Sequence, residues 1–242
     1  MRRESLVALP AGRLPLVASL ILAAVAAWAC LIAMATDMSA MGGSFLAWPT
    51  FVMWTVMMVA MMLPTAAPAI LVFAAATRRL PGRSAPLPYL FATGYLMAWT
   101  GFAALATTAQ WGLHELALLS PRQALDTPTW AGMVLLGAGL FQWTRLKDAC
   151  LRGCRSPMGL VAQGLPDRPA RALRAGIRLG LFCTGCCWAL MALMFVGGVM
   201  SLVWMAGLTL FILLEKLTRH PRRLSQGVGM LLIGSGGWLL LG

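Results

Sequence analysis

The 242 residues are 60% hydrophobic and only 11% charged, and their mean hydropathy is positive. This composition lies outside the range of soluble globular domains and predicts an all-α integral membrane protein, a polytopic helix bundle with a single domain over residues 1–242. The net charge of +12 does not indicate a nucleic-acid partner, because the basic residues are spaced between apolar runs and do not form one basic domain.

The first apolar run follows a short basic segment at the amino terminus. Its 23 uncharged residues exceed the apolar core of a signal peptide and suffice to cross a bilayer, so we expect it to be retained. Together with the later apolar runs, it predicts about seven spans. The glycines of the last run predict close helix packing in preference to a nucleotide-binding loop. The approximate bounds of the predicted spans are residues 14–36, 50–77, 87–111, 127–144, 179–198, 201–215 and 224–242.

A long uncharged stretch runs from Leu179 to Leu214. As one helix, these 36 residues would be ~54 Å long, well beyond the ~30 Å hydrocarbon core of a bilayer. We therefore expect the stretch to fold back, with the turn at Gly197 and Gly198 near its middle. A hairpin gives seven spans, whereas a re-entrant second half would give six.

The basic residues lie almost entirely on one side of this predicted topology. Eighteen of the nineteen Lys and Arg residues fall in segments on the side of the amino terminus, and only Arg122 falls on the other. Cytoplasmic segments of membrane proteins carry an excess of Lys and Arg. The count therefore predicts that the basic side is cytoplasmic, with the amino terminus inside and the carboxy terminus outside.

Five methionines crowd the second predicted span just before a proline. At 100° per residue, Met53, Met57 and Met61 form one stripe of the helix, and Met58 and Met62 form another on an adjoining face. Thioethers are soft ligands suited to Cu(I). Methionine is equally a flexible filler of apolar cores, so the pattern leaves both interpretations open.

Three cysteines lie within five residues in the sequence CTGCCWALM. On a helix, Cys183, Cys186 and Cys187 fall within about 100° of one another, Met191 follows on the same helix, and Met194 returns to the face of Cys183. A soft monovalent cation held by two or three of these sulfurs would satisfy the ligand chemistry without leaving a bare charge in the membrane. The alternative is that these cysteines pack as small hydrophobic residues, as we expect for Cys30.

Two further cysteines, Cys150 and Cys154, are four residues apart and share one face of a continuing helix. Nearby Lys147, Arg152 and Arg155 are expected to lower the pKa of both thiols. The predicted topology places this pair on the same side of the membrane as the CTGCC thiols. A metal site and a redox dithiol both fit the spacing.

With these motifs, the chain resembles a family of bacterial integral membrane proteins described as predicted metal-binding. The resemblance covers about residues 54–217 and implies a metal-binding function in a bacterial inner (cytoplasmic) membrane, with copper as the metal. Its matching elements are MWTVMMVAMMLP in the second span, Gln142, Lys147, Cys150, Cys154 and Pro157 around the fourth, and CTGCCWALM, GGVM, Trp204 and EKL in the hairpin.

The sequence thus predicts a soft-metal protein, with Cu(I) as the suspected metal, that acts in metal transport or in metallation of another protein. Partners would be the bilayer, the metal ion and a metallochaperone or membrane complex; a thiol redox protein and a non-catalytic structural subunit are the alternatives. Hydrolysis is not expected, because no Ser, His and Asp set or paired carboxylates occur in a supporting context. The predicted metal ligands are Cys183, Cys186, Cys187, Cys150, Cys154, Met57, Met58, Met61, Met62, Met191 and Met194, and the predicted counter-ions or supporting residues are Glu215, Lys216, Lys147 and Gln142.

Overall fold

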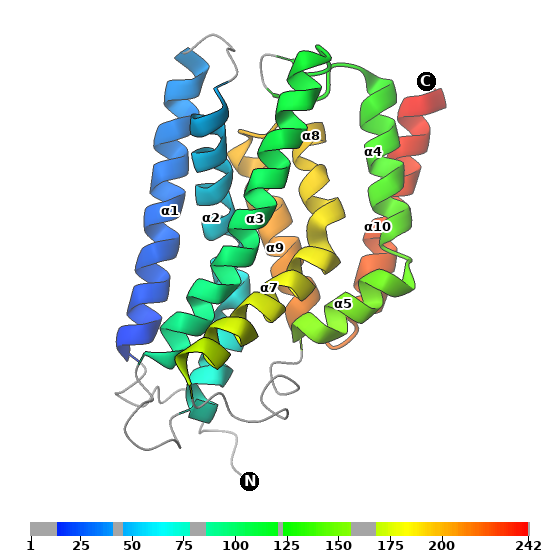
Figure 1. Cartoon of the computed structure of the whole chain (residues 1–242). Helices are drawn as coiled ribbons and strands as arrows, with labels where there is room; N and C mark the ends of the chain where they lie inside the picture. The colour runs from blue at the N-terminus through cyan, green and yellow to red at the C-terminus, as the bar shows by residue number, and fades with distance from the viewer. Residues whose placement is uncertain (1–13, 41–45, 78–85, 121–122, 156–167, 242) are drawn as a thin grey trace.

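The computed structural model describes residues 14–40, 46–77, 86–120, 123–155 and 168–241 (Figure 1). Within these ranges the chain is helical and has no β-strand, which confirms the expected all-α class. Arg122 and Pro157 lie outside the described residues. The helices are α1 (Leu14–Ala40), α2 (Ala47–Thr77), α3 (Leu87–Glu115), α4 (Pro128–Phe141), α5 (Arg145–Arg155), α7 (Pro169–Ala192), α8 (Met194–Gly197), α9 (Leu202–Leu217) and α10 (Pro221–Leu241).

Five of the described helices are long and apolar enough to cross a membrane, judged by length and composition. They are α1, α2, α3, α7 with α8, and α10. Helix α4 is apolar but has only 14 residues, and α9 has 16. The number of seven spans therefore stays a prediction. Helix α7 starts at Pro169, about ten residues before the expected span, because its basic first turns continue the helix beyond the apolar segment.

Helix α2 continues through two prolines, and at one of them another helix replaces the lost hydrogen-bond donor. Pro64 has no backbone N–H, so the carbonyl of Ala60 lacks its usual partner four residues on. The indole Nε1 of Trp28, on α1, donates to this carbonyl over 3.1 Å. This bond ties α1 to α2 at the level of the methionines.

Glycines allow two helix pairs to approach closely. A Cβ atom on Gly176 of α7 would lie 2.0 Å from the carbonyl oxygen of Phe91 on α3. In the pair α4 and α10, Cβ atoms on Gly229 and Gly236 would lie 2.8 to 3.0 Å from atoms of α4. The prediction that the glycines of the last run serve helix packing is confirmed for Gly229 and Gly236, whereas Gly227, Gly234 and Gly237 have no other atom within 4 Å of a Cβ position.

The uncharged stretch folds back after α8, as its length requires. Gly198 has φ of 90°, a conformation that favours glycine, and α9 begins four residues later. The indole Nε1 of Trp204 donates to the carbonyl of Leu193 over 2.8 Å, and its ring lies against Gly197. Helix α9 thereby returns beside α2 and brings Lys216 back to the level of Cys183.

The basic elements gather at one end of the bundle. In Figure 1, α5, the start of α7 and the turn between α9 and α10 lie at the lower end, and the carboxy terminus lies at the upper end. Helix α5 contains seven polar or charged side chains, counting its two cysteines, among eleven residues and packs against α7. This end of the bundle holds the residues considered next.

Candidate metal centre

Three thiols from two helices meet in the interior. Cys154 of α5 and Cys183 and Cys186 of α7 are buried, and their Sγ atoms all lie within 4.8 Å of one another. The two helices can approach because a Cβ atom on Gly153 would lie 2.8 Å from the ring of Phe182. Local helical spacing thus supplies two of the thiols, and the packing of α5 on α7 supplies the third.

The thiol of Cys183 is the most connected of the three. Lys216 Nζ on α9 donates to its Sγ over 3.1 Å, and the hydroxyl of Tyr95 on α3 lies 3.1 Å from the same atom. Lys216 Nζ also donates to Thr65 Oγ1 on α2 over 2.8 Å. Side chains from α2, α3, α5, α7 and α9 therefore converge here, and an ammonium group contacts the sulfur directly.

The remaining predicted cysteine ligands lie close to the centre but are not part of the group of three. Cys187 is buried, and its thiol donates to the carbonyl of Cys183 over 2.8 Å, as the thiol of Cys186 does over 3.1 Å. Cys150 is half-buried, with its Sγ 2.9 Å from the position that a Cβ atom on Gly185 would occupy. All six cysteines are free thiols, and Cys30 lies exposed on α1, so it does not pack in the interior as expected.

The expected lowering of the thiol pKa values on α5 is wrong. The pKa of Cys154 is raised, first because its thiol proton is held in hydrogen bonds to Cys183 and Cys186 and then because of burial. Burial raises the pKa of Cys150. The cations expected to act on them are engaged elsewhere or exposed: Lys147 pairs with Glu215, Arg155 donates to the Thr218 carbonyl, and Arg152 faces outward.

The methionines of α2 are buried along the interior of the bundle. Met57, Met58, Met61 and Met62 are each at most 1% exposed. Met62 lies at the thiol end: its Sδ is 3.9 Å from Thr65 Oγ1, the atom that accepts from Lys216. The thioethers thus form a buried column along α2 that ends one side chain away from the thiol centre.

The two methionines that follow the thiols on the chain are also buried. Met191 is eight residues after Cys183, so it lies ~12 Å further along the helix axis. Met194 is in α8, beyond the end of α7. Both lie in the core on the side of the thiols away from the basic end.

A second buried polar group surrounds Glu215. Lys147 Nζ of α5 lies 2.7 Å from Glu215 Oε1, and the hydroxyl of Ser225 on α10 donates to the same oxygen. Gln142, at the end of α4, is buried, and its amide atoms have no hydrogen-bond partner among the described residues. Glu215 and Lys216 are adjacent, yet one faces α5 and α10 and the other faces α2 and α7.

Sequence reasoning missed Tyr95, Thr65 and Ser225. Each carries a buried hydroxyl, and a buried hydroxyl needs a hydrogen-bond partner. Tyr95 is one of only two tyrosines in the chain, which is the only signal that could have drawn attention to it. Which partner each hydroxyl finds depends on the packing of helices distant in sequence.

The arrangement suits a soft, monovalent cation. Three thiolate donors without carboxylate or imidazole select Cu(I) over hard cations, and burial excludes water from the site. The Lys216 ammonium offsets part of the negative charge that thiolates would bring into the interior. The ion pair between Glu215 and Lys147 connects α9, which carries Lys216, with α5, which carries Cys154.

Comparison with known proteins agrees with this chemistry. No match was found among curated proteins or among solved structures. A family model described as PpoB2, copper chaperone, matches residues 51–239 and so includes the methionine column, the three thiols and Lys216. Because the match covers more than three quarters of the chain, the protein belongs to the PpoB2 copper chaperone family.

Proposed function

We propose that this protein is an integral membrane copper chaperone that holds Cu(I) between Cys154, Cys183 and Cys186. The observation that carries the proposal is the meeting of three buried thiols from two helices, all within 4.8 Å. Cys187 and Cys150 lie beside the centre and supply additional thiol ligands, and Lys216 is the counter-ion of the centre. Membership of a copper chaperone family supports the choice of metal.

The proposed orientation places the thiol centre at the cytoplasmic side of a bacterial inner membrane. Support comes from the excess of Lys and Arg in α5, in the first turns of α7 and in the turn before α10, which lie at one end of the bundle. Copper would enter or leave through this end and pass to a metallochaperone or to a membrane complex that needs copper. Seven spans, with the amino terminus inside, remain part of this proposal.

Metal analysis of the purified protein in reducing buffer tests the assignment of ligands. We expect about one copper per chain, with sulfur neighbours in the X-ray absorption spectrum. The variants Cys154→Ser and Cys183→Ser should each lose most of this copper, and the exposed Cys30→Ser should retain it. Equal copper content in all four proteins would contradict the site, and metal-free protein with a reversible disulfide would instead support the thiol redox alternative.

The methionine column is proposed as the route between the thiol centre and the opposite face. Weak thioether sites that lead to stronger thiolates would let each site release what it binds. Changing Met57 and Met61 together to leucine keeps volume and should cost less than about 1.5 kcal/mol in packing. We expect this variant to bind copper at the thiols but to exchange it more slowly across the membrane of reconstituted vesicles. Unchanged exchange would make the methionines core filler.

A further inference from the structure

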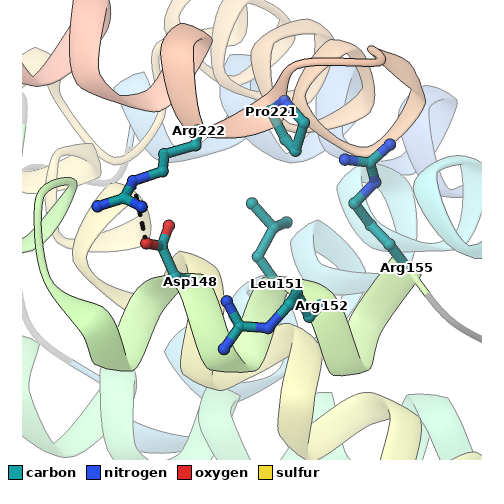
Figure 2. Close-up of a pocket in the computed structure, with 6 residues that line it drawn as sticks. All are labelled: Asp148, Leu151, Arg152, Arg155, Pro221 and Arg222. Atoms are coloured by element: carbon teal, nitrogen blue, oxygen red, sulfur yellow. Dashed lines mark ion pairs between the residues drawn. The ribbon is translucent and has the colours of Figure 1, made fainter.

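A basic pocket opens at the same end of the molecule as the thiol centre. It lies between α5 and the start of α10 and has a volume of about 650 Å³ (Figure 2). Among the described residues, six line the pocket, of which four are charged and three are arginines. The lining residues are Asp148, Leu151, Arg152, Arg155, Pro221 and Arg222.

The arginines are only partly neutralised within the pocket. Arg222 lies 3.3 Å from Asp148, and its side chain is 66% exposed, so this pair is weak and open to water. Arg152 is exposed on the rim, and Arg155 donates to the Thr218 carbonyl over 2.5 Å. The lining keeps two positive charges in excess, and guanidinium groups bind carboxylates through paired hydrogen bonds.

One wall of the pocket is α5, which also carries a thiol of the centre. Arg155 directly follows Cys154 on α5, and buried Leu151 lies one turn before it. Thr218, whose carbonyl Arg155 contacts, is two residues after Lys216 on α9. A ligand held by the pocket arginines would therefore lie beside the helix that carries Cys154.

We propose that this pocket binds a soluble, peptide-sized thiol that bears two or more carboxylates and delivers Cu(I) as its thiolate complex. The proposal rests on the function proposed above, since it names the source of the copper. The pocket is open to solvent, and its volume is in the range of pockets for small molecules, about 300 to 1,000 Å³.

A phospholipid headgroup would also bring negative charge, but its acyl chains need an apolar surface beside the arginines. Leu151 and Pro221 give the lining an apolar part as well, so both kinds of ligand match its composition. The position of the pocket beside the helix that carries Cys154 favours a soluble copper carrier with several carboxylates, and the measurement in nanodiscs described below identifies a lipid headgroup if one binds here.

The transfer is a ligand exchange without change of oxidation state. The bond between Cu(I) and the carrier sulfur breaks as a bond between Cu(I) and a protein sulfur forms. The proton displaced from the protein thiol passes to the carrier, which leaves as a free thiol. Cys154 is the first acceptor, because it is the ligand on the helix that forms the pocket wall.

Copper loading from two donors tests the proposal. Reduced, metal-free protein in detergent receives Cu(I) either as its acetonitrile complex or as its glutathione complex, and loading is followed by ultraviolet absorption of the copper thiolate. The test variant is Arg152→Gln with Arg222→Gln. The matched control is Arg145→Gln with Arg223→Gln, which removes one exposed arginine from each of the same two helices but none from the pocket lining.

We expect the test variant to load from glutathione at least about tenfold more slowly than wild type, the loss of roughly 1.4 kcal/mol of binding. The control variant should load at the wild-type rate, and all three should load equally from acetonitrile. Equal rates from glutathione in all three proteins would overturn the proposal. Failure of wild type to load from acetonitrile would instead overturn the proposed function.

A direct binding measurement tests the pocket even if the wild-type protein does not load copper from acetonitrile. S-methylglutathione carries the carboxylates but cannot transfer copper, and calorimetry should show that it binds wild type and the control variant but not the test variant. Absence of binding to wild type would overturn the proposal. The proposal would also be overturned if the test variant differed from wild type only in nanodiscs of phosphatidylglycerol, because that result would identify the pocket as a lipid headgroup site.

Discussion

Replacing Lys147 with methionine should destabilise the protein strongly, because it leaves a buried carboxylate without its partner. Lys147 Nζ and Glu215 Oε1 are 2.7 Å apart, and each side chain is only 1% exposed. Removal of one member of a buried ion pair typically costs about 3 to 5 kcal/mol, most of it the cost of the unpaired charge. The Ser225 hydroxyl still contacts the carboxylate in this variant, but one neutral donor does not offset a full charge.

The double variant Lys147→Met with Glu215→Met separates the loss of the pair from the burial of one charge. It removes both charges and keeps side chains of similar length, and buried ion pairs replaced by apolar residues are often neutral in stability. Ser225 retains its bond to the Pro221 carbonyl at 3.0 Å. We expect the double variant to lie within about 1.5 kcal/mol of wild type.

The assay is reversible unfolding in mixed detergent, followed by circular dichroism, with copper content measured on the same samples. Arg222→Gln breaks the exposed pair with Asp148 and serves as the control, with an expected loss of no more than about 1 kcal/mol. If Lys147→Met and Arg222→Gln lowered the free energy of unfolding equally, the Lys147 pair would be solvated and the reasoning refuted. Copper content should follow stability, low in the single variant and restored in the double.

Three further changes probe the site and its supports. Tyr95→Phe removes a hydroxyl 3.1 Å from Cys183 Sγ and should weaken Cu(I) binding about tenfold in a chelator competition, and unchanged affinity would show that the contact is idle. Gly176→Ala places a methyl group against α3 and should lower stability by about 1 to 3 kcal/mol, whereas Gly101→Ala, with nothing within 4 Å, should not. Alkylation of Cys150, measured by mass spectrometry, should have its pH midpoint above that of free cysteine. The reason is that the raised pKa of the Cys150 thiol shifts thiolate formation to higher pH, and a lower midpoint would contradict the burial of this thiol.

The helices and the thiol-bearing face could be predicted because their signals are local. Apolar runs define most of the helices, and spacing of three and four residues places Cys183, Cys186 and Cys187 on one buried face. The length of the uncharged stretch predicts that it folds back, and the two glycines near its middle, Gly197 and Gly198, predict where. None of these features depends on how distant helices meet.

The choice of Cys154 over Cys150 could not be predicted, because both lie on one helix face by spacing. It depends on where α5 contacts α7, and this is set by Gly153 against Phe182 and by the pair of Lys147 with Glu215. The same limit explains the wrong pKa expectation for α5. Sequence proximity of cations to a thiol says nothing of where long side chains point after packing.

Helix α9 connects the supports of the metal centre in one element. Because adjacent residues on a helix point about 100° apart, Glu215 reaches Lys147 on α5 while Lys216 reaches Cys183 on α7. The thiol centre lies between α5 and α7, so α9 fixes the distance between its two halves through one ion pair and one ammonium contact. A rotation of α9 would disturb both contacts together, and the Glu-Lys dipeptide therefore acts as a single structural unit beside the proposed copper site.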